Sequence, residues 1–166
     1  MRERTNSSLI VDFVNSGTGL TAWLSQRAGE PTIDEADVVA ARDLRGALLT
    51  LLRAHSGCVS DGTEVPAAQA YLQRIAVRYP LVPRISVEGC VLAPAQTGVL
   101  GVFGALLAAV TELAYQGEWP RVKVCKNIAC YEAFFDRTRN SSGLYCSAAC
   151  GSQVAMRAYR SRQKTA

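Results

Sequence analysis

Four of the six cysteines lie in one C-terminal segment, with the spacing Cys125-x4-Cys130-x15-Cys146-x3-Cys150. Two close pairs separated by a loop of this length are the arrangement in which four thiolates surround one tetrahedral Zn²⁺ at about 2.3 Å. Because the chain supplies all four ligands, no coordination position is left for a substrate water, and we expect one structural ion. Cys58 stands alone, as does a sixth cysteine, Cys90; both are interpreted as small apolar residues.

Two disulfides, or a redox or catalytic thiol site, are the alternatives for these cysteines. The first residues, Met1-Arg2-Glu3-Arg4-Thr5-Asn6, run into only a short apolar segment and do not have the pattern of a signal peptide. In the cytoplasm thiols are kept reduced, and paired cysteines there usually bind metal. We therefore expect cytoplasmic localisation and zinc.

The positive charge of the chain is concentrated at its cysteine-rich end. Residues 118–166 contain nine Lys or Arg against three acidic residues, a net charge of +6, whereas residues 1–117 have a net charge of −2. This asymmetry is typical of a nucleic-acid-binding segment, although a solvated basic tail has the same pattern. The sequence has no Ser-His-Asp set, glycine-rich phosphate loop or paired-carboxylate signature, so enzymatic activity is left open but not favoured.

The secondary structure that must position the cysteines is predicted from hydrophobic periodicity and capping residues. The most apolar run, 99–110, is shorter than the roughly 20 residues that a bilayer requires, and we interpret it as part of a core helix rather than a membrane segment. Ser147 is placed to cap a last helix that carries Cys150 in its first turn. The predicted segments are a strand or extended stretch over 8–14, helices over 20–28, 34–54, 66–79 and 94–115, a hairpin over 83–92 with its turn at Glu88-Gly89, and short strands over 121–124 and 132–136.

These elements predict an α+β protein in two parts. Residues 1–117 would form a mainly helical N-terminal domain with a small β-hairpin. Residues 118–166 would form a small treble-clef-like or ββα four-cysteine zinc finger with a basic C-terminal helix. The boundary falls in the stretch 116–120, which contains Gly117 and Pro120.

Motifs at both ends of the chain resemble one family. The segment Val11-Asp12-Phe13-Val14-Asn15-Ser16 is similar to its Leu-Asp-Phe-Val-Asn-Thr opening, and Ala41-Arg42-Asp43-Leu44-Arg45 fits a second stretch. The chain thus resembles the CGNR zinc-finger family, in which an ABATE-type helical domain precedes the finger. The resemblance implies a stress-induced transcription regulator with DNA as its partner. The finger motifs that match are Cys125, Cys130, Phe134-Phe135-Asp136, Arg139-Asn140, Tyr145-Cys146-Ser147 and Cys150-Gly151.

The chain departs from the family at basic positions. The family motif continues with Asn, Arg and a later Lys where Ser152, Gln153 and Ala155 stand here, and it has Arg-Arg-Trp in place of Gly143-Leu144-Tyr145. Each phosphate contact contributes about one unit to the salt slope of DNA binding, so these changes would weaken binding to DNA. Gln153 itself could pair with adenine. The candidate DNA-binding residues that remain are Arg137, Arg139, Gln153, Arg157, Arg160, Arg162 and Lys164.

Two functional hypotheses follow. In the first, the protein is a zinc-dependent DNA-binding transcriptional regulator whose N-terminal domain senses a small molecule or mediates homodimerisation. In the second, it is a small-molecule-binding or biosynthetic protein whose finger is a structural or protein-docking module that has lost its DNA contacts. The candidate ligand-binding residues each have a structural alternative, either capping of backbone, an ion pair or a helix-end cation; they are Asp12, Asn15, Arg45 and His55.

Overall fold

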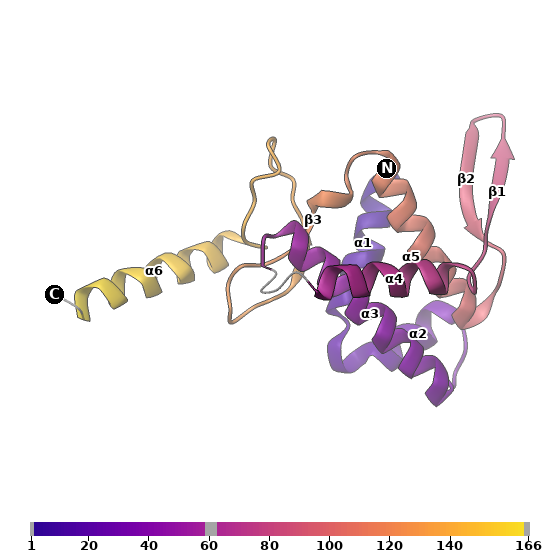
Figure 1. Ribbon diagram of the computed structural model, residues 1–166, viewed down its shortest axis with the longest axis horizontal. Helices are drawn as coiled ribbons and strands as arrows, with labels where there is room; N and C mark the ends of the chain where they lie inside the picture. The colour runs from indigo at the N-terminus through magenta and orange to yellow at the C-terminus, as the bar shows by residue number, and fades with distance from the viewer. Residues whose placement is uncertain (1, 59–62, 165–166) are drawn as a thin grey trace.

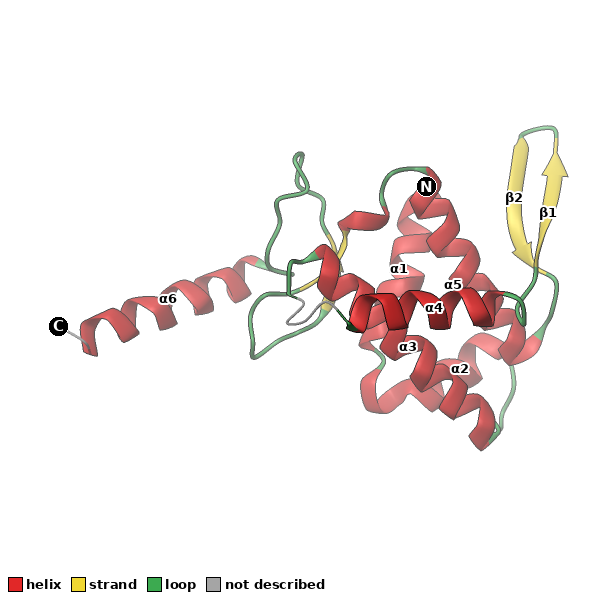
Figure 2. Cartoon of the chain, viewed as in Figure 1, coloured by secondary structure: helices red, strands yellow, loops and turns green. Residues whose placement is uncertain are grey.

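The computed structural model describes residues 2–58 and 63–164, except for the side chains of residues 2–5 and 164. Helices dominate, with one two-stranded hairpin in the N-terminal region and a second in the C-terminal region (Figure 2). This is the α+β fold that the sequence predicts. The elements are α1 (Arg2–Asn15), η1 (Gly17–Gly19), α2 (Leu20–Ala28), α3 (Glu35–His55), α4 (Glu64–Ala76), β1 (Leu81–Ser86), β2 (Gly89–Pro94), α5 (Gly98–Tyr115), η2 (Trp119–Arg121), β3 (Val122–Val124), β4 (Ala133–Phe135) and α6 (Ala148–Lys164).

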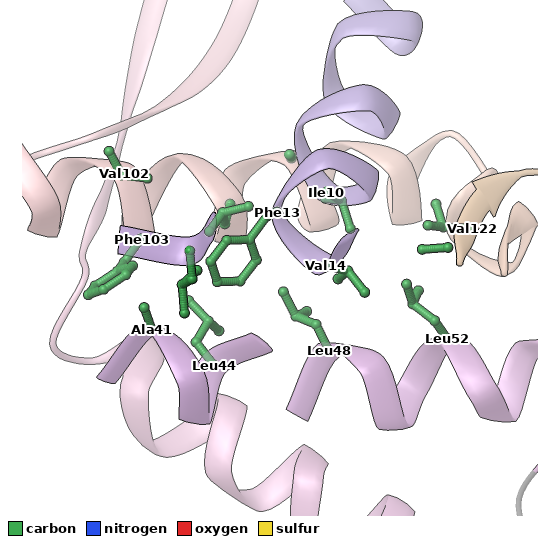
Figure 3. Packing of buried hydrophobic residues seen from close by; sticks show 14 of the residues in the cluster. Ile10, Phe13, Val14, Ala41, Leu44, Leu48, Leu52, Val102, Phe103 and Val122 are labelled. Carbon is green, nitrogen blue, oxygen red and sulfur yellow. The ribbon is translucent and has the colours of Figure 1, made fainter. Parts of the chain in front are cut away.

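The hydrophobic core lies between α1, α3 and α5. Leu44, Leu48 and Leu52 are four residues apart on α3 and form one fully buried stripe, as the helical periodicity predicts. Ile10, Phe13 and Val14 of α1 and Phe103 of α5 pack against that stripe (Figure 3). The long helix α3 therefore serves as the platform on which the other elements assemble.

The prediction of a strand or extended stretch over 8–14 is wrong, because this segment belongs to α1. Its β-branched residues favour a strand locally. However, Ile10, Phe13 and Val14 have the i, i+3, i+4 spacing of one helix face, and all three are buried against α3 and α5. Burial of this face in the core outweighs the local preference of the segment.

The N-terminal hairpin forms as predicted, with shifted boundaries. Strands β1 and β2 pair antiparallel from Leu81↔Pro94 to Ser86↔Gly89, so the two-residue turn is Val87-Glu88 and not Glu88-Gly89. Because β2 extends to Pro94, α5 begins at Gly98 rather than at residue 94. In Figure 1 the hairpin stands away from the helical body.

Both ends of α4 also differ from the prediction. Helix α4 begins at Glu64 and ends at Ala76, so Pro66 is its third residue, where its missing N–H still costs no helical hydrogen bond.

Helix α5 is long and apolar enough to cross a membrane by length and composition. It packs against α1, α2 and β2, and 44% of it is buried, as befits a core helix.

The C-terminal strands are continuous with the N-terminal core. β3 and β4 pair antiparallel with Val122 opposite Phe135, and they pack against α3 and α1 respectively. Val122, Val124 and Ala133 are buried within the same hydrophobic cluster as the α1 and α3 side chains. By contrast, α6 extends away from the rest of the molecule (Figure 1). The segment between β3 and α6 thus joins the packed core to a projecting helix.

Candidate metal centre and basic helix

The four cysteines predicted to bind zinc converge on one point. Cys125 directly follows β3 and is buried, Cys130 precedes β4, Cys146 lies in the loop before α6, and Cys150 is in the first turn of α6. Their sulfur atoms all lie within 4.8 Å of one another. The Ser147 Oγ atom accepts a hydrogen bond from the Cys150 backbone N–H at 3.3 Å, which is the predicted helix cap.

The sulfur separations fit a tetrahedral ion and not disulfides. Cys146 Sγ lies 3.6 Å from Cys130 Sγ and 3.7 Å from Cys150 Sγ. A tetrahedron with Zn–S bonds of about 2.3 Å places its sulfurs about 3.8 Å apart, whereas a disulfide bond is about 2.05 Å long. Four sulfur ligands fill a tetrahedral site, so the chemistry that a Zn²⁺ ion would supply here is structural.

Burial and hydrogen bonding shift the pKa values of two of the clustered thiols in opposite directions. Burial and hydrogen bonding with Cys130 and Cys150 raise the pKa of Cys146 to about 12. Hydrogen bonds from Asn127 and Ser147 lower the pKa of Cys150 to about 7. A divalent cation offsets the repulsion among thiolates held this close, so the donor set favours binding of a metal.

A buried ion pair holds the loop that leads to Cys146. The Lys123 Nζ atom of β3 lies 2.7 Å from Asp136 Oδ2 and also donates to the Ser141 carbonyl. Burial alone would raise the pKa of Asp136, but hydrogen bonds from Lys123, Thr138 and the Gly143 N–H outweigh it and hold the pKa well below its usual range. These bonds fix the turn that returns the chain from β4 to the third cysteine.

Both parts of the chain match known protein families. Residues 4–116 match the ABATE family, described as "Putative stress-induced transcription regulator", and residues 121–163 match the CGNR zinc finger. The chain belongs to the ABATE family. The four clustered cysteines of its CGNR finger fit one structural Zn²⁺, as expected from their spacing. No curated protein matches the sequence of this ABATE-family chain.

The basic candidates of the ABATE-family chain lie on the finger loop and on α6. Arg137 and Arg139 are exposed on the turn after β4. Gln153 is exposed on α6, and its Oε1 atom accepts a hydrogen bond from Asn127 Nδ2 at 2.9 Å. Arg157 donates from its guanidinium to Asn127 Oδ1. The remaining candidates, Arg160, Arg162 and Lys164, follow on the same helix, and the Lys164 side chain lies outside the described residues.

Two of the four candidate ligand residues tie the N-terminal region to the finger. The Asn15 Oδ1 atom accepts from the Ala133 N–H at 2.8 Å, and Asn15 Nδ2 donates to the Ala133 carbonyl at 3.0 Å. His55 Nδ1 lies 2.9 Å from the Val122 carbonyl, and its ring meets Trp119 edge-on at 5.0 Å. A carbonyl only accepts, so Nδ1 carries the proton. Burial is the main cause that lowers the pKa of His55, which keeps the ring neutral at pH 7.

The other two candidates contact residues that are closer in the sequence and lie within the N-terminal region. Arg45 Nε donates to the Val14 carbonyl at 2.7 Å, and Asp12 lies 3.5 Å from the Arg27 guanidinium on the surface. The four residues therefore do not converge on one site. Of the four, only Asp12 and Asn15 line a groove of about 860 Å³ between α1 and the finger. The wall of this groove also includes Phe134, Phe135, Arg137 and Tyr145.

Sequence reasoning missed two polar residues at the centre of the finger junction. Asn127 is fully buried between the first two cysteines, where a short asparagine in a tight loop signals backbone capping. Ser56 at the end of α3 accepts from the Val124 N–H at 2.7 Å and donates to the Leu52 carbonyl at 2.9 Å. Its partner is 68 residues away, and no local pattern marks such a contact.

Proposed function

We propose that this protein is a cytoplasmic, zinc-dependent, DNA-binding transcriptional regulator that docks on DNA through α6. One observation supports this most directly. Helix α6 extends away from the body (Figure 1), and the side chains beyond Val154 are exposed as far as Gln163. Arg157, Arg160 and Lys164 are spaced by three and four along it and therefore share one face.

The physical properties of α6 favour a nucleic-acid partner. A helix of 17 residues is about 25 Å long and fits the major groove, which is about 12 Å wide. An isolated helix of this length is only marginally stable in water, and a polyanion along its basic face would stabilise it. The +6 charge of residues 118–166 lies in the finger and this helix, whereas residues 1–117 are slightly acidic.

The test is DNA affinity by fluorescence anisotropy at about 50 and about 200 mM salt, where phosphate contacts dominate the salt dependence. We expect the zinc-loaded wild type to bind duplex DNA, and we expect the R157A/R160A/K164A variant to show a salt slope smaller by about three units. The matched control is R74A/R78A/R84A, which removes three exposed arginines from α4, from the turn that follows it and from β1. Absence of binding, or equal loss of slope in both variants, would refute the proposal.

We further propose that the N-terminal region regulates this activity, either by sensing a small molecule or by homodimerisation. Sensing is supported by the groove between α1 and the finger, whose 860 Å³ lies in the range of ligand pockets and whose wall includes Phe134, Phe135 and Tyr145. Dimerisation is supported by the exposed apolar side chains Ile85 and Val87 of the hairpin.

The groove also supports the alternative function, a small-molecule-binding or biosynthetic protein in which the finger is structural. Direct bonds such as Asn15–Ala133 and His55–Val122 join the finger to the body, as a structural staple requires. A fragment library screened by NMR amide shifts would identify ligands of the groove. Measuring DNA affinity with and without such a ligand then distinguishes the two functions. A groove ligand that changes DNA affinity supports the sensor, whereas a groove ligand bound by a protein without DNA affinity supports the alternative. Sedimentation velocity reports dimerisation separately.

A further inference from the structure

The outer edge of β4 carries two pairs of backbone hydrogen-bonding groups, one at Ala133 and one at Phe135. In an antiparallel ladder, alternate residues of a strand point both their N–H and their C=O toward the partner strand. The Cys125 N–H donates to the Glu132 carbonyl at 2.8 Å, so the even-numbered residues in and beside β4 face β3. The N–H and C=O of Ala133 and of Phe135 therefore face away from β3.

The first of these pairs is filled by a side chain. The Asn15 amide accepts from the Ala133 N–H at 2.8 Å and donates to the Ala133 carbonyl at 3.0 Å. A primary carboxamide can do both because its oxygen and one of its N–H hydrogens lie on the same edge, with the oxygen and nitrogen about 2.3 Å apart. The protein itself thus shows which chemical group fits a donor–acceptor pair on this strand edge.

The second pair, at Phe135, has no such partner. Within residues 2–58 and 63–164, the part of the chain that is described, no hydrogen bond reaches the outward N–H or the outward C=O of Phe135. Phe135 is half-buried and lines the groove of about 860 Å³ between α1 and the finger. A backbone donor and acceptor beside apolar walls are typical polar anchors of a small-molecule pocket.

The shape of this edge favours a small molecule over a peptide strand. An added strand pairs with every second residue of the edge, and the next position, Ala133, is already occupied by Asn15. In the other direction β4 ends, because it spans only Ala133–Phe135. A peptide could therefore pair with a single residue, whereas a small molecule needs no more than that.

Resting on the proposed sensing role of the groove, we propose that its ligand is a small molecule with a primary carboxamide or a lactam. This group donates to the Phe135 carbonyl and accepts from the Phe135 N–H, as the Asn15 amide does at Ala133. A secondary amide does not fit, since its favoured trans form points N–H and C=O in opposite directions. A carboxylate does not fit, since it has no hydrogen to donate. The apolar part of the ligand packs against Phe134 and Tyr145.

A ligand in the groove also meets the start of α6. Tyr145, Cys146 and Ser147 line the same groove, and the Ser147 side chain caps α6. The ligand therefore contacts β4 as well as the segment that sets the position of the proposed DNA-binding helix. This contact gives the groove a direct route to DNA affinity.

The test is an NMR titration of the zinc-loaded protein with three matched probes, which are 1-naphthamide, N-methyl-1-naphthamide and 1-naphthoate. We expect 1-naphthamide to bind about fivefold or more tightly than either of the others, the value of one hydrogen bond. Its binding should shift the Phe135 amide resonance downfield and slow the exchange of that amide with solvent about tenfold or more. Equal affinity for 1-naphthamide and its N-methyl form overturns the proposal.

Two variants locate the site. Ser8→Trp places a large ring in the groove from the exposed side of α1 and should lower the affinity for 1-naphthamide about tenfold or more. Gln69→Trp places the same ring on the exposed surface of α4 and should leave the affinity unchanged. Equal affinities in the two variants overturn the placement of the ligand in the groove.

A second readout needs no ligand. In the free protein the Phe135 amide should exchange about tenfold or more faster than the amides of Ala133 and Phe134, which donate to Asn15 and to β3. Equal protection of all three amides overturns the proposal. A protein that binds 1-naphthamide as described but has no DNA affinity overturns the proposed regulator and retains the site. A protein that binds DNA but none of the three probes overturns the site alone.

Discussion

Replacing Asn15 by alanine should loosen the attachment of the finger to the body. The variant loses the hydrogen bonds at 2.8 and 3.0 Å by which the Asn15 amide occupies the backbone N–H and C=O of Ala133 on the outer edge of β4. Asn15 is itself exposed, so water can reach the vacated position. The appropriate scale is therefore the net value of about 0.5–1.5 kcal/mol per hydrogen bond, and we expect a loss of about 2 kcal/mol in the free energy of unfolding.

The assay is urea unfolding of the zinc-loaded protein followed by circular dichroism. With a urea dependence of about 2 kcal/mol per molar, the midpoint of Asn15→Ala should fall by about 1 M relative to the wild type. Asn140→Ala is the control, because Asn140 is exposed on the finger turn and surface changes usually alter stability by less than about 0.5 kcal/mol. If the two variants unfold at the same urea concentration, the Asn15 amide does not hold β4 and the reasoning is refuted.

Three further outcomes are expected. Cys130→Ser should lose the single bound zinc measured by elemental analysis, whereas Cys58→Ser, at a cysteine that is not part of the cluster, should retain it; equal zinc content would exclude the four-sulfur site. Gly143→Ala should cost about 1–3 kcal/mol in thermal unfolding, because its Cβ would lie 2.6 Å from Asp136 Oδ1, an atom held by other hydrogen bonds; an unchanged Tm would contradict this. Since the pKa of His55 is lowered in the fold, the unfolded chain binds more protons, so stability should fall as the pH drops below about 6.5, and His55→Gln should flatten that dependence in pH-dependent unfolding.

The features that were predictable are those encoded over short distances in the chain. Cysteine spacing predicted the zinc site, because the ligands of the two pairs are only five and four residues apart. The stripe of Leu44, Leu48 and Leu52 predicted α3, and Ser147 predicted the start of α6. In each case the physical cause lies within one or two helical turns of its effect.

The features that failed depend on partners far along the chain. Residues 8–14 of α1 were predicted as a strand or extended stretch because they are β-branched and apolar, while the surfaces that bury Ile10 and Phe13 are supplied by α3 and α5. The role of Asn15 depends on Ala133, 118 residues away, and nothing near Asn15 announces a strand edge. Gln153 is exposed on α6, yet its Oε1 atom accepts a hydrogen bond from Asn127, which lies 26 residues earlier in the chain.

The continuity of the core with the finger limits how this protein can be divided. Val122 lies across from Leu52 at one end of the hydrophobic cluster (Figure 3), so a fragment cut at residue 117 would leave that end of α3 facing water. The released finger would in turn expose Val122, Val124 and Ala133. The ABATE and CGNR segments therefore need each other to bury these side chains. A chimera that joins this body to a foreign finger must also import a first strand that fits α3.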